Sequence, residues 1–107
     1  MRITFDNDLV RGVCEDYELA CEHYGLEKTL ILLARFSDIE AASCIGDIKI
    51  GRFVIKEVTE EKITLVYYFT HEDDQSITFE YLQNEKLLLD YSSYKKISRV
   101  KLINIEL

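Results

Sequence analysis

A change of hydrophobic periodicity near residue 48 constrains the fold of this chain most strongly. Between residues 11 and 48, apolar residues recur at intervals of three and four, which is the spacing of one face of a helix. Beyond Ile48 they alternate with polar residues, which is the spacing of a strand with one buried face. The sequence therefore predicts an α+β fold, with helices from the earlier part packed on a sheet from the later part.

Local signals divide the helical part. A strand is predicted at Arg2–Phe5, and Asn7 or Asp8 can cap a helix running from about residue 8 to 24. Gly25 can adopt the left-handed conformation that ends a helix. A second helix is then predicted from about residue 26 to 42, followed by one further turn that ends near Ile48.

The later part of the sequence predicts a sheet. Strands are expected at Gly51–Val58, Lys62–Thr70, Ile77–Leu82 and Ile97–Ile105, with Lys86–Tyr91 as either a strand or an irregular edge. Ile63, Leu65, Tyr67 and Phe69 share one face of the most apolar strand, which should be central. Alternation in the last strand places Val100, Leu102 and Asn104 on one face and Ile105 on the other. The order βααββββ predicts one domain over residues 1–107, an N-terminal helical hairpin packed on a twisted antiparallel sheet.

Charge is unevenly distributed along the sequence. The chain has 20 acidic and 13 basic side chains, a net charge of −7. Residues 1–48 hold ten acidic and four basic side chains, and residues 49–107 hold ten and nine. Proteins that grip phosphate backbones usually present a basic stripe. The basic run here is limited to Lys95, Lys96, Arg99 and Lys101, so binding to bare nucleic acid should be weak or absent.

The cysteine spacing predicts no disulfide between the helical cysteines, and the N-terminal residues and apolar runs predict neither secretion nor a membrane span. Cys14 and Cys21 would lie about 10 Å apart along a helix, whereas a disulfide needs Cα atoms within about 7 Å. No Cys-x-x-Cys spacing is present, so no metal site and no cofactor are predicted. The first residues carry charges rather than a secretory signal, and no apolar run approaches the roughly 20 residues that span a bilayer. A cytoplasmic protein without membrane contact is expected.

The order of small and apolar residues matches a known pattern. Val13-Cys14, Ala20 and Gly25 correspond to L-C-x(5)-A-x(4)-G. Leu33–Phe36, Ala41-Ala42 and Ile45–Ile48 correspond to a Leu- and Arg-rich helix followed by A-A-x-x-L-x-D-L. Residues 89–106 are similar to L-D-W-S-x-V-x-x-V-x-I-L-E-I, with Tyr91-Ser92 as the aromatic–serine pair. In these respects the chain resembles the HigB-like, plasmid-maintenance killer toxins of the RelE/ParE superfamily.

The resemblance implies a RelE-like fold and a toxin component of a type II toxin–antitoxin module. Such toxins cleave mRNA on the ribosome without a metal, and the implied partner is a cognate antitoxin, commonly with a helix-turn-helix domain. Cleavage needs fixed cations around the scissile phosphate. Lys56 matches the lysine of the family's Lys-Gly turn, but Glu57 replaces its glycine and Ser76 replaces its strand arginine. The Asp-Tyr-His expected from many family members does not occur in the sequence up to Leu107.

The resemblance therefore gives one catalytic candidate, Lys56, and predicts inefficient cleavage. The basic run Lys95, Lys96, Arg99 and Lys101 supplies the candidates for RNA binding. Contacts to the ribosome and mRNA are expected only if the protein is active.

Other readings of the sequence stay open. The net charge of −7 also fits a non-catalytic acidic binding protein, such as a phage or mobile-element inhibitor of a basic nucleic-acid-binding partner. His71 in His-Glu-Asp-Asp is either a general base or hard-metal ligand, or part of an acidic turn. Five tyrosines form either a surface for stacking bases or ordinary sheet packing: Tyr67, Tyr68, Tyr81, Tyr91 and Tyr94.

Overall fold

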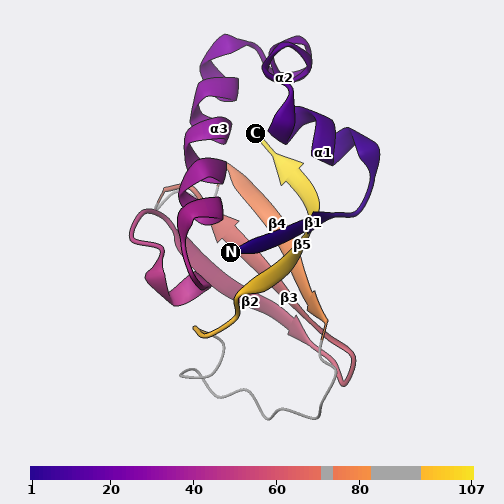
Figure 1. Ribbon diagram of the computed structural model, residues 1–107, viewed down its shortest axis with the longest axis vertical. Coiled ribbons are helices and arrows are strands. Elements are labelled where there is room, and N and C mark those ends of the chain that lie inside the picture. The colour runs from indigo at the N-terminus through magenta and orange to yellow at the C-terminus, as the bar shows by residue number, and fades with distance from the viewer. Residues whose placement is uncertain (71–73, 83–94) are drawn as a thin grey trace.

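The computed structural model describes residues 1–70, 74–82 and 95–107 of the chain (Figure 1). Strand β1 (Arg2–Phe5) is followed by helices α1 (Asp8–Glu15), α2 (Tyr17–Tyr24) and α3 (Leu26–Ala41) and the 3₁₀ turn η1 (Ile45–Asp47). Strands β2 (Arg52–Val58), β3 (Lys62–Tyr68), β4 (Ser76–Leu82) and β5 (Arg99–Glu106) complete the described elements. The α+β class is as predicted. The predicted positions His71, Lys86–Tyr91, Ser92 and Tyr94 lie outside the described residues.

The sheet is mixed rather than antiparallel. Its strand order is β1-β5-β4-β3-β2, and β1 pairs with β5 in the parallel direction while the other pairs are antiparallel. A parallel neighbour needs a long crossover connection. Almost the whole chain lies between β1 and β5, so no hairpin fixes their relative direction. The prediction of a wholly antiparallel sheet is wrong for this reason.

The helical part contains three helices instead of a hairpin of two. Asn7 caps α1 by accepting a hydrogen bond from the Val10 amide at 3.0 Å. Asp16 has extended backbone angles, and its carboxylate accepts hydrogen bonds from the amides of Glu18 and Leu19 at 3.0 and 3.2 Å. An aspartate that caps α2 in this way interrupts the predicted long helix after α1. Gly25 ends α2 with φ +82°, as predicted.

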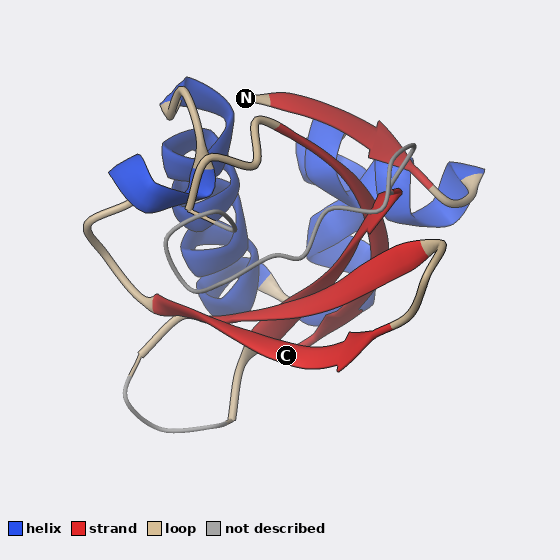
Figure 2. Ribbon diagram, turned by 90° about the horizontal axis from the view of Figure 1, so that it is seen from below, coloured by secondary structure: helices blue, strands red, loops and turns tan. Residues whose placement is uncertain are grey.

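One face of the sheet is buried under the helices (Figure 2). The apolar residues of β3 and the one that follows it, Ile63, Leu65, Tyr67 and Phe69, are all buried, as predicted. Ile77 and Phe79 of β4 continue this core across the sheet. The helices contribute Val13, Leu32, Phe36 and Ile39. We call the opposite side of the sheet, whose strand residues point away from these helices, the outer face.

A β-bulge in β5 changes which of its residues face the core. Phe79 pairs with Leu102 while Thr78 pairs with Asn104, so Ile103 is an extra residue in β5. Residues beyond the bulge therefore exchange faces. Ile105 is buried on the core face with Leu102, and Asn104 is exposed. The faces predicted for Asn104 and Ile105 by strict alternation are wrong because the bulge adds a residue.

No helix in the described ranges is long and apolar enough to cross a membrane.

The central position of β3 gives a test of the core. Leu65 is fully buried, so Leu65→Ala should lower the free energy of unfolding by about 2–5 kcal/mol through lost apolar contacts and a residual cavity. Leu30→Ala is the matched control, because Leu30 on α3 is 54% exposed and its removal should change stability by no more than about 0.5 kcal/mol. Urea denaturation of both variants measures the difference. Equal effects at the two positions would contradict this core.

Candidate functional site

Charge is separated between the two layers of the molecule. The helical part, residues 7–48, carries nine acidic and three basic side chains. The five strands carry six basic and three acidic side chains. The basic ones are Arg2, Arg52, Lys56, Lys62, Arg99 and Lys101. Because the core face of the sheet is apolar, these cations belong to the outer face, so an acidic chain presents a locally basic surface.

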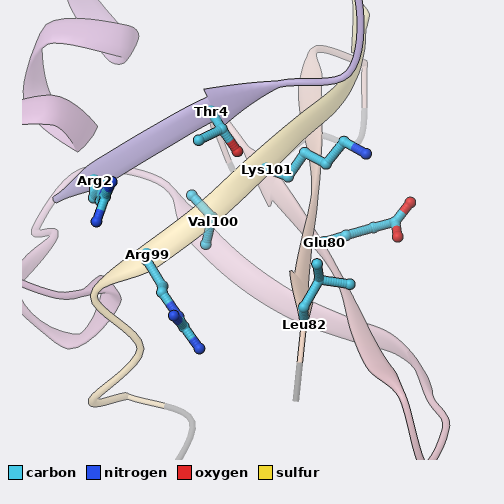
Figure 3. A pocket seen from close by; sticks show the side chains of 7 residues that line it. All are labelled: Arg2, Thr4, Glu80, Leu82, Arg99, Val100 and Lys101. Carbon is cyan, nitrogen blue, oxygen red and sulfur yellow. The ribbon is translucent and has the colours of Figure 1, made fainter. Parts of the chain in front are cut away.

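A cleft of about 300 Å³ lies over β1, β5 and β4 (Figure 3). Its lining residues are Arg2, Thr4, Glu80, Leu82, Arg99, Val100 and Lys101. Arg2 and Arg99 are direct partners in the parallel register of β1 and β5, and both are exposed. Like charges in directly opposed strand positions repel each other. An anion placed between the two guanidinium groups would relieve this repulsion.

The cationic groups of the cleft differ in how they are compensated. Lys101 Nζ lies 3.3 Å from Asp6 Oδ1, and Glu80 Oε2 lies 3.3 Å from Lys62 Nζ. Neither Arg2 nor Arg99 forms an ion pair with any residue in the described ranges. The Arg99 guanidinium carbon instead lies 5.9 Å from the centre of the Tyr81 ring. Arg2 and Arg99, which we call the arginine pair, are therefore the groups of this cleft best suited to bind an anion.

A second group of cations lies around Tyr68, toward the β2 edge of the same outer face. The Arg52 guanidinium carbon lies 4.5 Å and Lys56 Nζ 5.5 Å from the centre of the Tyr68 ring. Lys56 is the extra residue of a β-bulge, because Ile55 pairs with Leu65 and Glu57 pairs with Thr64. We call Arg52, Lys56 and Tyr68 the Tyr68 cluster. It combines an aromatic ring with two positive charges.

The structure does not bring the sequence-predicted site residues together. Lys56 is on β2, and β3 and β4 separate it from Arg99 and Lys101 on β5, a distance of about 14 Å at the usual strand spacing. Lys95 and Lys96 are exposed just before β5, where the Lys95 carbonyl accepts a hydrogen bond from the Gly46 amide at 2.9 Å. They are not among the lining residues of the cleft.

Sequence reasoning missed three cations of the outer face, Arg2, Arg52 and Lys62. The signal for them was available, because each directly precedes an apolar residue of the core face, namely Ile3, Phe53 and Ile63. Alternation places such residues on the face opposite the core. The parallel pairing that sets Arg2 beside Arg99 had no comparable local signal.

The described part of the cleft offers charge for binding but little for proton transfer. Glu80 is the carboxylate among its lining residues, and it is paired with Lys62. Burial raises the pKa of the Cys14 thiol to about 12, with smaller contributions from Glu15 and Glu40, so this cysteine is a neutral packing residue. Within residues 1–70, 74–82 and 95–107, no three His, Cys, Asp or Glu side chains gather closely enough to hold a metal ion.

No protein-family model matches the chain, and neither a curated protein nor a solved structure is significantly similar to it. The function must therefore be argued from the residues of the outer face and from the sequence pattern.

The arginine pair predicts stabilisation by a polyanion. About 5 mM pyrophosphate, compared with sodium chloride of equal ionic strength, should raise the melting temperature by roughly 2–5 °C, because the anion binds the folded state alone. Arg2→Gln should abolish this shift. Lys28→Gln, which removes an exposed cation from α3, should leave it unchanged. Thermal unfolding followed by circular dichroism measures the shift, and an undiminished shift in Arg2→Gln would exclude this anion site.

Proposed function

We propose that this chain is a divergent toxin component of the RelE/HigB type, which contacts RNA phosphates through its outer sheet face but cleaves RNA poorly or not at all. The observation that carries the proposal is the arginine pair, which lines a cleft on a basic face and forms no ion pair with any described residue. Phosphate is a ligand that suits this pair, because each guanidinium group can donate two parallel hydrogen bonds to its oxygens.

The places of the pattern residues support the toxin part of the proposal. Cys14 and Ala20 are buried between the helices, and Gly25 has the positive φ that separates α2 from α3. These are structural roles, which explains why a divergent sequence would keep them. A strand, helices and then four strands are also compatible with the RelE-like order βααββββ, with one additional break at Asp16. The corresponding partner is a cognate antitoxin, commonly one with a helix-turn-helix domain.

The two cationic groups of the outer face support an extended ligand. The arginine pair and the Tyr68 cluster lie on the same outer face but diagonally across it: β5 and β2 are three strand spacings or about 14 Å apart, and Tyr68 is level with Glu106, roughly 20 Å along β5 from Arg99. An aromatic ring beside cations can stack with a base while the cations contact phosphates. A single-stranded RNA crossing the strands would reach both groups. Its affinity in isolation should be weak, because the whole chain carries a charge of −7.

The same geometry argues against efficient cleavage. Attack of a 2′-hydroxyl on phosphorus requires several fixed cations at one phosphate, and losing such a cation typically removes about 3–4 kcal/mol of transition-state stabilisation. Lys56 is the one residue that matches the family's cationic set, and it belongs to the Tyr68 cluster instead of the arginine pair. Lys56 and the arginine pair therefore do not meet at the same phosphate.

Co-sedimentation with bacterial ribosomes tests the proposal. At low salt the protein should pellet with ribosomes, because contacts to RNA phosphates strengthen as salt is removed. The double variant Arg2→Gln/Arg99→Gln should lose most of this binding, and Lys28→Gln should keep it. Primer extension on mRNA from the same mixtures should detect no cleavage above background. Strong cleavage that Lys56→Ala abolishes would contradict the proposal. Ribosome binding that is unchanged in Arg2→Gln/Arg99→Gln would also contradict it.

The acidic helical layer of the molecule favours a second candidate function. The nine acidic and three basic side chains of residues 7–48 fit a non-catalytic acidic protein that binds a basic nucleic-acid-binding partner. The ribosome experiment separates the two. Binding through the acidic layer would be unaffected by Arg2→Gln/Arg99→Gln and would be reduced by Glu18→Lys/Glu22→Lys, since both glutamates are exposed on α2.

A further inference from the structure

Helix α3 presents apolar side chains on both of its sides. Its inner side contributes the apolar residues Leu32, Phe36 and Ile39 together with the polar Thr29, and all four are buried. Its solvent-exposed side carries Leu26, Leu30 and Ile31, which are 57%, 54% and 37% exposed. The small residue Ala34 continues this line and is also exposed. We call these four exposed residues the α3 strip. The core does not require the strip, because a helix with one buried side normally carries polar residues on the other.

The α3 strip continues into a groove beside the sheet. The groove has a volume of about 390 Å³ and is lined by Leu30, Ile31, Ala34, Arg35, Phe69, Thr70 and Gln75. Phe69 is 3% exposed and belongs to the core, so the groove reaches the edge of the hydrophobic interior. Figure 1 shows α3 along one side of the molecule, with α1 and α2 on its other side. A partner segment could therefore contact both the strip and the groove.

The spacing of the strip indicates the shape of its occupant. Leu26, Leu30 and Ala34 are separated by four residues each and form a straight ridge along α3. Ridges of this spacing fit the grooves on the surface of another helix. An amphipathic helix laid beside such a ridge buries its own apolar side in the same contact.

The charges around the strip indicate the chemistry of its occupant. On the exposed side of α3, Glu27 and Asp38 flank the apolar residues at opposite ends, about 16 Å apart along the helix axis. Lys28 and Arg35 lie toward the edge of this side, and Arg35 pairs with Asp38 at 3.4 Å. The surrounding helical part is strongly acidic, with nine acidic and three basic side chains. A second copy of this chain would bring two acidic layers together, whereas lysine or arginine would be attracted.

We propose that the α3 strip and its groove are the docking site for an amphipathic helix of a partner protein, apolar on one side and carrying lysine or arginine at both ends of that side. The site is formed by α3 and the residues next to β3 and β4, and it shares no lining residue with the cleft at the arginine pair. The proposal therefore stands independently of the RNA-binding proposal.

Two synthetic peptides test this site directly. Both are helices of about 18 residues with the same leucine and alanine face, one with lysine and one with glutamate at the flanking positions. Fluorescence anisotropy at roughly 150 mM salt should show the lysine peptide binding at least about tenfold more tightly than the glutamate peptide. Leu30→Ser should weaken the lysine peptide by about tenfold. Leu9→Ser is the matched control, since Leu9 on α1 is 53% exposed, and it should change binding less than about twofold.

Several outcomes would overturn the proposal. Equal binding of the two peptides would show adhesion without charge selection, and equal losses in Leu30→Ser and Leu9→Ser would show that the contact lies elsewhere. Failure of the lysine peptide to bind would exclude a basic helix as the occupant. Sedimentation of the protein alone tests whether a second copy of the chain covers the strip. A dimer that Leu30→Ser dissociates would assign the strip to that second copy. Circular dichroism spectra of the variants establish that each is folded.

Discussion

The burial of one side of β3 determines the register of the sheet and the face on which the helices pack. Ile63, Leu65 and Tyr67 leave water completely, and full burial of an apolar side chain contributes about 1.5–3 kcal/mol. A shift of one residue in the pairing of β3 would turn this whole set to solvent. The neighbouring strands are therefore held in register, and the helices are held on a single face. Every charged residue of the strands is then directed to the outer face, which is how an acidic chain acquires a basic surface.

Several parts of the fold could be predicted because their signals are local. The alternation of β3, the capping residue Asn7 and the helix-ending Gly25 each depend on neighbouring residues in the sequence. The helix break at Asp16 also had a local signal, an N-cap residue inside an apolar pattern, but helix spacing on both sides concealed it. The bulge at Ile103 had one too, because the apolar positions change there from Val100 and Leu102 to Ile103 and Ile105, but the prediction assumed strict alternation through Asn104.

The candidate site was predictable only in part. Lys56, Arg99 and Lys101 lie on the outer face, yet Lys56 is at the opposite edge of the sheet from the other two. Lys95 and Lys96 are near Arg99 in sequence but lie outside the cleft. Arg2 completes the arginine pair through a parallel pairing between the two ends of the chain. Such a contact depends on the path of the whole chain, so sequence neighbours carry no information about it.

The molecule has two distinct surfaces, a basic one on the sheet and an acidic, partly apolar one on α3. NMR titration of the isotopically labelled protein with a short single-stranded oligouridylate at low salt tests this separation most directly. Amide shifts should concentrate in β1 and β5 around the arginine pair, with smaller shifts near Tyr68 and none on the exposed side of α3. Shifts concentrated on α3, or spread evenly over both layers, would contradict this separation.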